Sequence, residues 1–207
     1  MKKYQYPVTP CIDSSSTLAL CQEISPDHQP LYIEVKPLAG ENPKDCFFII
    51  DRYVQAHGGE RIIGWAIWEL PLVFVEAEFH AVWLSPTGEY IDLTPRSSNT
   101  ARCLFLPDPS MAYSGRQVDN IRRPISQLPE VAAWLGVQKR LFEIKNRGDR
   151  ATQIGEIEFL GEEAREIFSA QQSETLKWFE VSRLIPAVGP YLPCPCGSGK
   201  KVKWCCD

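Results

Sequence analysis

The sequence predicts an α+β protein in which an N-terminal helix packs against an antiparallel sheet. A helix is expected over 45–57, where apolar residues recur at helical spacing, Asp45 stands at the N-cap position and two glycines follow. Three runs rich in Ile, Val, Trp and Phe come next, at 61–70, 72–84 and 89–93, and their composition is typical of strands. Because a helix is followed by strands that short turns connect, the α+β class is favoured.

The other elements are predicted from shorter patterns. Residues 1–43 are rich in Pro and Ser and indicate loop, apart from one strand at 31–35. Further strands are expected at 141–147 and 155–160, and a C-terminal helix is expected at 162–185. The side chains expected on the buried face of that helix are Phe168, Leu176, Phe179 and Leu184.

The chain of 207 residues, 23.5 kDa in mass, has the composition of a folded globular protein. A hydrophobic fraction of 44% and a charged fraction of 23% exclude a disordered chain, a fibre and a membrane span. The net charge of -4 provides no basic footprint, so we do not expect the core to bind nucleic acid. We expect a core domain over 1–185, a Pro-rich linker over 186–193 and a small tail over 194–207.

Four of the eight cysteines stand in the last fourteen residues, a segment too short to build a hydrophobic core. Clustered thiols without an export signal indicate a reducing compartment, so we expect a cytoplasmic protein. Four thiolates can bind Zn²⁺ tetrahedrally, and the metal would then supply the folding energy of the tail. The predicted zinc ligands are Cys194, Cys196, Cys205 and Cys206. The alternative is a flexible tail with redox-active thiols.

The tail resembles the SEC-C motif, a zinc-binding segment at the C-terminus of the protein-translocation ATPase and of many unrelated bacterial proteins. The resemblance rests on the string C-P-C-G-S-G-K-K-x-K-x-C-C that follows Pro193, and it covers under a tenth of the chain. It implies the same four cysteine ligands. It also implies an unknown partner, because such tails dock on a chaperone, a ribosome or lipid, but it implies no reaction. Val202 stands where the family usually has an aromatic residue.

Cys46 is a candidate nucleophile, because it follows Asp45 at the first position of the predicted helix. Free backbone amides and the helix dipole stabilise a thiolate there, and the same amides can hold the oxyanion that forms when a carbonyl is attacked. A nucleophilic cysteine also needs a base and a group that orients this base. Of the three histidines, His80 lies within a predicted strand, on the face that carries Glu76 and Glu78 and opposite an apolar face.

The turn after this strand leads to a geometric prediction. With a three-residue loop at 86–88, where Pro comes first and Gly last, Val82 pairs with Asp92. His80 and Asp92 then lie as diagonal neighbours on one face of the hairpin, within side-chain reach. A two-residue loop would place them on opposite faces. Asp92 is therefore the candidate group that orients His80.

This order of residues resembles the transglutaminase-like branch of the papain-type cysteine hydrolase fold. The resemblance covers 45–95 and rests on a cysteine at a helix start, an H-A-V-W string in one strand and an I-D-L-T-P string in the next. It implies Cys46 as nucleophile, His80 as base and Asp92 as orienting group. Lys44 replaces the glycine that is usual two residues before the cysteine.

The predicted function is hydrolysis or acyl transfer at an amide bond, with a protein or peptide as substrate and Zn²⁺ in the tail. The alternative is a non-enzymatic adaptor, whose tail docks on a chaperone, a ribosome or nucleic acid. The basic run at 200–203 favours the adaptor.

Several residues have more than one interpretation. In a third hypothesis His80 binds a metal in the core together with Glu76 or Glu78. Trp65 and Trp68 are expected in the core, although either could line a substrate groove. No role is assigned to Cys11, Cys21 and Cys103.

Overall fold

The computed structural model describes residues 2–4, 6–96, 100–153, 157–191 and 200–204. The helices are α1 (Ser15–Ile24), α2 (Cys46–His57), α3 (Pro129–Lys145) and α4 (Gly161–Ser182), with 3₁₀ turns η1 (Gly148–Thr152) and η2 (Val202–Trp204). The strands are β1 (Lys2–Lys3), β2 (Leu31–Val35), β3 (Glu60–Leu70), β4 (Phe74–Leu84), β5 (Tyr90–Asp92), β6 (Arg102–Pro107), β7 (Ile121–Pro124) and β8 (Ala187–Val188). The predicted α+β class is confirmed.

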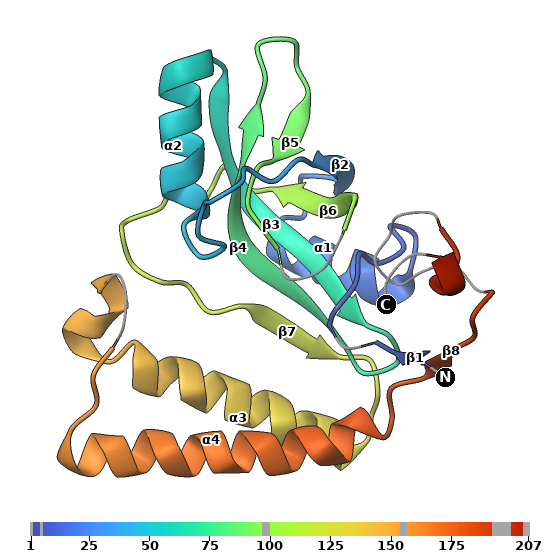
Figure 1. The fold of residues 1–207 in the computed structure, drawn as a ribbon, viewed down its shortest axis with the longest axis vertical. Coiled ribbons are helices and arrows are strands. Elements are labelled where there is room, and N and C mark those ends of the chain that lie inside the picture. The colour runs from blue at the N-terminus through green and yellow to red at the C-terminus, as the bar shows by residue number, and fades with distance from the viewer. Residues whose placement is uncertain (1, 5, 97–99, 154–156, 192–199, 205–207) are drawn as a thin grey trace.

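The central strands curve into a small barrel. Their order around it is β3, β6, β2, β5 and β4, and the pairing of β4 with β3 completes the ring. The pairing of β2 with β5 is parallel, whereas β3 pairs antiparallel with both of its neighbours. The short strand β7 pairs with the first residues of β4 and leads to the last two long helices (Figure 1). The sheet therefore closes on itself, which the alternation pattern of single strands does not predict.

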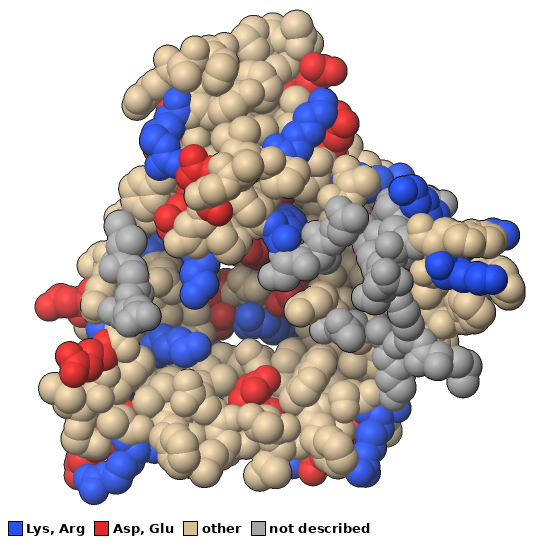
Figure 2. Space-filling model, viewed as in Figure 1, with Lys and Arg blue, Asp and Glu red and all other residues tan. Residues whose placement is uncertain are grey.

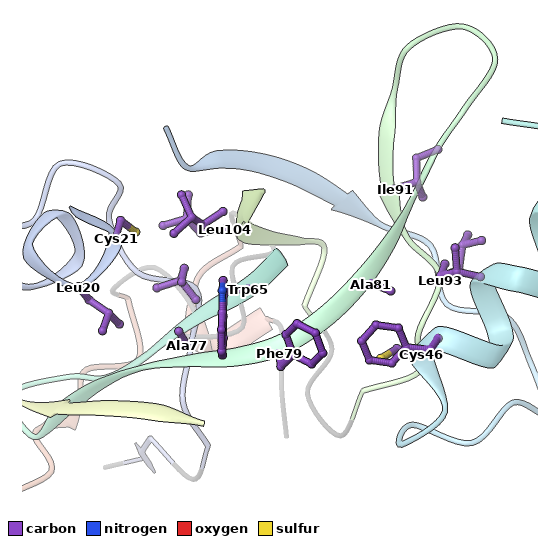
Figure 3. Packing of buried hydrophobic residues seen from close by; sticks show 14 of the residues in the cluster. Leu20, Cys21, Cys46, Trp65, Ala77, Phe79, Ala81, Ile91, Leu93 and Leu104 are labelled. Carbon is purple, nitrogen blue, oxygen red and sulfur yellow. The ribbon is translucent and has the colours of Figure 1, made fainter. Parts of the chain in front are cut away.

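Side chains alternate between the inside and the outside of the barrel wall. One apolar cluster joins side chains from β2, β3, β4 and β6 and consists of Ile33, Ala66, Trp68, Val82, Cys103 and Phe105. The larger cluster lies between the opposite face of these strands and the helices α1 and α2 (Figure 3). In that cluster Phe79 and Ala81 of β4 pack with Phe47 and Ile50 of α2. Each of the Phe and Ile side chains stabilises the fold by about 1.5–3 kcal/mol, so α2 is held firmly along β4.

The helices α3 and α4 form an antiparallel pair that lies across one end of the strands (Figure 1). Trp134 of α3 packs on Phe74 of β4, with ring centroids 5.4 Å apart, and on Trp178 of α4, at 5.3 Å. Val131 and Val181 are completely buried in the same cluster.

The predicted buried face of α4 is wrong. Phe168, Leu176 and Phe179 are 60%, 69% and 61% exposed, and Leu184 is half-buried after the helix ends. The buried residues of α4 are instead Ile167, Ala170 and Val181. The helix carries apolar residues on two sides, and α3 covers one of them, so the spacing of the apolar residues did not identify the covered side.

Three other expectations about secondary structure need correction. Residues 15–24 form helix α1 in the segment expected to be loop, because Ser14 caps it by accepting a hydrogen bond from the amide of Thr17. The strand expected at 141–147 is the end of α3 and the turn after it, since a short apolar run fits either structure. Of the strand expected at 155–160, residues 157–160 form no strand, and 155 and 156 lie outside the described residues.

The segment between α4 and the tail is paired rather than free. In the linker predicted over 186–193, Ala187 and Val188 pair with Lys3 and Lys2 as an antiparallel two-stranded sheet. None of the helices in the described part of the chain is both long and apolar enough to span a membrane.

Candidate functional site

The hairpin of β4 and β5 has the register predicted from its turn. The amide of Ser85 donates to the carbonyl of Glu89 across the loop, at 2.9 Å, and Leu84 pairs with Tyr90. Continuing this register by two residues places Val82 opposite Asp92. The three-residue loop is thus confirmed, and His80 and Asp92 share a face.

His80 and Asp92 are hydrogen-bonded to each other inside the protein. His80 Nε2 lies 3.0 Å from Asp92 Oδ1, and the side chains are 2% and 0% exposed. Asp92 Oδ1 also accepts the backbone amide of Thr94, at 2.9 Å, which fixes the carboxylate. Arg96 Nη2 also lies 3.1 Å from His80 Nε2. A carboxylate only accepts, so Nε2 donates to Asp92 and Nδ1 is the ring nitrogen that can bond to another group.

Cys46 is that other neighbour of His80. It is the first residue of α2, is 8% exposed, and lies beside Ala81 and Leu93 (Figure 3). Burial by itself lowers the pKa of His80, but the charges of Asp92 and Cys46, with hydrogen bonds to both, raise that pKa to about 10. The structure therefore brings together all three residues of the predicted set, with the imidazole between the thiol and the carboxylate.

The start of α2 has free hydrogen-bond donors. The side chain of Asp45, although it stands at the N-cap position, makes no capping hydrogen bond, and the first intrahelical bond to Asp45 comes from Ile49. The amides of the first turn, including that of Cys46, point out of the helix end. This arrangement suits the stabilisation of negative charge next to the sulfur.

Arg96 is a further residue of this site that sequence reasoning missed. Its Nε and Nη2 donate to Asp92 Oδ2 at 3.0 and 2.8 Å, and its Nη1 donates to Glu78 at 3.1 Å. The guanidinium lies on the ring of Trp68, 4.5 Å from the centroid, and Trp68 in turn donates to Glu78. Although burial alone would raise the pKa of Asp92, the charges of His80 and Arg96 hold that pKa far below its usual range. The sequence signal that could have identified Arg96 was its position four residues after Asp92, just beyond the end of β5.

The third hypothesis, a core metal bound by His80 and a glutamate, gains no support. Glu78 accepts hydrogen bonds from Arg96 and Trp68, and Glu76 accepts them from Arg122 and Asn120. Within the described residues, no three potential metal ligands lie together. The carboxylates on the His80 face are neutralised by arginines instead.

The two tryptophans considered for a groove are in the core. Trp65 is 3% exposed and donates to the carboxylate of Asp108 at 3.0 Å, and Trp68 is 6% exposed beneath Arg96. The core interpretation of both is confirmed.

The cysteines without an assigned role have different surroundings. Cys103 is fully buried, and its sulfur lies 3.9 Å from Asp92 Oδ2. Its pKa is raised well above the ordinary value, mainly because the thiol is buried and in addition because Asp92 is negatively charged. Burial raises the pKa of Cys21 to about 11, whereas Cys11 is exposed. Cys103 therefore belongs to the surroundings of Asp92 as a neutral thiol.

Two cavities lie away from this set. One, of about 390 Å³, lies beside Cys21 and His28, and the other, of about 530 Å³, lies between the start of α3 and the end of α4. Figure 2 shows in addition a hollow between the α3–α4 pair and the strands above it, where acidic and basic side chains gather.

The predicted zinc ligands Cys194, Cys196, Cys205 and Cys206 lie outside the described residues. The residues around them show that the chain folds back: the amide of Lys203 donates to the carbonyl of Pro190 at 2.8 Å. The rings of Tyr191 and Trp204 meet at a centroid distance of 6.1 Å. Val202 is 5% exposed, so it packs inward at the position where the SEC-C family usually has an aromatic residue.

Comparison with known proteins adds no assignment. No protein-family model matches the sequence, and no solved structure matches the fold.

Proposed function

We propose that the protein is a cysteine-dependent amide hydrolase or acyl transferase. In this proposal the sulfur of Cys46 attacks the amide carbonyl carbon, His80 transfers a proton to the departing amine, and Asp92 orients His80. The observation that carries the proposal is the buried His80–Asp92 hydrogen bond of 3.0 Å, together with the position of Cys46 at the start of α2, from which its charge acts on His80. Its support also includes the raised pKa of His80, which shows that Asp92 and Cys46 both act on the imidazole.

The proposed reaction has two steps. The sulfur of Cys46 bonds to the carbonyl carbon, and the electron pair moves to the oxygen, which the first amides of α2 hold. His80 then gives a proton to the amine as the C–N bond breaks, which leaves a thioester on Cys46. Water, or a second amine, attacks the thioester while His80 takes its proton, and the C–S bond breaks to restore the thiolate.

Alkylation of individual cysteines, measured by peptide mass spectrometry, tests this proposal. At pH 6 we expect iodoacetamide to label Cys46 at least about tenfold faster than the buried Cys21 and Cys103, because burial raises the pKa of those two thiols and leaves them protonated. The variant His80→Gln is expected to lose about tenfold or more of the Cys46 rate. The exposed Cys11 serves as an internal reference, since its surroundings do not change.

Equal and slow labelling of Cys46, Cys21 and Cys103 would contradict the proposal, because it would mean that all three react only when the fold opens. A Cys46 rate that does not depend on His80 would contradict it as well.

We propose in addition that the tail binds one Zn²⁺ ion through Cys194, Cys196, Cys205 and Cys206. The support is the pattern of the four cysteines and the hydrogen bond between Lys203 and Pro190, which brings the two flanks of the tail together. A bound metal would supply folding energy to this short segment, as in other small zinc modules.

Metal analysis of the purified protein tests the zinc proposal. We expect about one zinc ion per chain when no chelator is used, and under about a tenth of that in the double variant Cys205→Ser/Cys206→Ser. The variant Cys11→Ser, which removes an exposed thiol far along the sequence from the tail, is expected to keep its zinc. A wild-type protein without metal, or a full complement in the double variant, would refute the assignment.

One observation favours a docking role as the second candidate function. Trp204 and Tyr191 are 60% and 59% exposed, and Lys203 lies 5.8 and 5.4 Å from their ring centroids. Figure 2 shows basic side chains at the edge of the molecule where η2 lies in Figure 1. Exposed aromatic and basic side chains suit a partner surface of opposite charge. Uniformly slow labelling of the core cysteines, together with bound zinc, would favour this adaptor role.

A further inference from the structure

The proposed nucleophile is closed off in the described structure. Cys46 is 8% exposed, and both cavities described above are lined by other residues. An amide carbonyl can reach the sulfur only after a covering group has moved. The identity of that group is informative, because the space it fills next to Cys46 is the space that a substrate would enter.

The candidate for the covering group is Tyr113, in the long connection between β6 and β7, because its ring contacts Phe47 and Phe48 in the first turn of α2. This connection is fastened near its start, where Asp108 accepts Trp65 Nε1 at 3.0 Å, and near its end, where the amide of Gln117 donates to the carbonyl of Ala151 at 2.9 Å. Between these points Ser114 and Gly115 are exposed, and Gly115 has a φ of 79°. The middle of the connection is therefore held mainly by side-chain contacts.

Tyr113 makes the most specific of these contacts. Its ring lies flat on Phe47, with centroids 3.9 Å apart and planes 5° from parallel, and the edge contact with Phe48 is at 6.3 Å and 88°. The guanidinium of Arg61 lies 5.9 Å from the centroid of Phe47. Tyr113 therefore occupies an aromatic slot on the first turn of α2.

This slot and Cys46 belong to the same first turn of α2. Partial burial first, and then the charges of Cys46 and Asp45, raise the pKa of Tyr113, which places the phenol within electrostatic reach of the start of α2. Phe47 is the residue directly after Cys46. A ring bound on Phe47 would thus hold an attached carbonyl group beside the thiol.

We propose that the face of Phe47 that Tyr113 covers is a subsite for an aromatic group of the substrate, and that Tyr113 fills it in the closed state. This inference rests on the role proposed above for Cys46. An aromatic side chain next to the amide would regain the stacking on Phe47 and the edge contact with Phe48, whereas an aliphatic one would not. The substrate class is therefore a peptide or amide with an aromatic group beside the bond that is attacked.

Competition between two alkylating reagents tests the subsite on the full chain. Iodoacetamide and its N-phenyl derivative carry the same reactive carbon, and the rate at the exposed Cys11 corrects for their intrinsic reactivity. In Tyr113→Ala we expect both reagents to label Cys46 faster than in the wild type, and the N-phenyl reagent to gain about tenfold over iodoacetamide. Tyr113→Phe, which keeps the ring, is expected to behave as the wild type.

A second substitution identifies the slot itself. Adding Phe47→Leu to Tyr113→Ala keeps an apolar side chain but removes the flat surface, so the preference for the N-phenyl reagent should fall to about onefold. Tyr113→Leu repeats the test of Tyr113→Ala with a smaller loss of packing. Labelling of Cys21 and Cys103 reports whether any variant has unfolded.

An equal gain for both reagents would overturn the subsite, because Tyr113 would then be a cover without specificity. An unchanged Cys46 rate in both Tyr113→Ala and Tyr113→Leu would overturn it as well. These outcomes differ from failure of the proposed function, in which Cys46 never reacts faster than Cys21 and Cys103 and does not depend on His80.

Discussion

Replacing Asp92 with asparagine is expected to lower the free energy of unfolding by about 3–5 kcal/mol at pH 6. Asp92 is completely buried and accepts hydrogen bonds from His80, Arg96 and the Thr94 amide. The amide side chain of asparagine preserves the shape but not the charge, so a buried imidazolium and a buried guanidinium lose their counter-ion. Urea denaturation monitored by tryptophan fluorescence measures the change.

The size of this effect should depend on pH in a defined direction. The folded-state pKa of Asp92 lies below its ordinary 3.8, so its contribution is present above about pH 4 and is lost as the pH falls further. The pKa of His80 rises from 6.5 to about 10, so its contribution is complete below pH 6.5 and is lost as the pH rises through 10. A double-mutant cycle of Asp92→Asn with His80→Gln should therefore give its largest coupling between about pH 4 and 6.5.

An exposed carboxylate provides the matched control. Glu23 also binds an arginine, Arg123, but both side chains are about half exposed, and Glu23→Gln should change the stability by less than about 1 kcal/mol. Equal effects of Asp92→Asn and Glu23→Gln, or a coupling that grows between pH 6.5 and 10, would contradict the buried ion network.

Replacing Gly64 with alanine is expected to cost about 3 kcal/mol of stability, because the barrel wall leaves no room for a methyl group. A Cβ at this position would lie 2.2 Å from the carbonyl oxygen of Leu106 and 2.7 Å from Cζ of Phe105. The obstructing oxygen is backbone of β6, which pairs with β3, so relief requires a shift of the barrel wall. Thermal and urea unfolding measure the loss.

Gly136→Ala is the control for this substitution. Gly136 lies within α3, and no atom stands within 4 Å of the place where its Cβ would lie. Alanine is the better helix former, so this variant should gain about 0.5–1 kcal/mol. A Gly64→Ala variant as stable as the wild type would show that β3 and β6 approach less closely at this point.

The elements that surround the candidate site were the most predictable from sequence. Helix α2 and the hairpin of β4 and β5 are local structures, in which the helical spacing of apolar residues, the Gly-Gly end and the Pro-to-Gly turn act over a few residues. For that reason the register that places His80 with Asp92 could be derived from the loop length alone. In α4, by contrast, Leu176 and Val181 are both apolar, and contact with α3 determines which of them is buried.

The remaining members of the site depend on contacts between distant parts of the chain. Arg96 reaches Asp92, Glu78 and Trp68 only because the barrel brings β3, β4 and the end of β5 together. Tyr113 lies on Phe47, 66 positions earlier in the chain, because the connection from β6 crosses the start of α2. The spacing of four residues between Asp92 and Arg96 is the one sequence signal for the first contact, and aromatic spacing carries none for the second.

By itself, the sequence determined the α+β class, the helix that begins at Cys46, and the hairpin register that joins His80 to Asp92, because helix ends and tight turns are set by neighbouring residues. Only the tertiary structure decided that the sheet closes into a barrel, that Arg96 neutralises Asp92, and that Tyr113 stacks on Phe47. The alternation of residues along a strand specifies the face on which a side chain lies. Closure of the barrel and packing of the helices determine which residues contact that side chain.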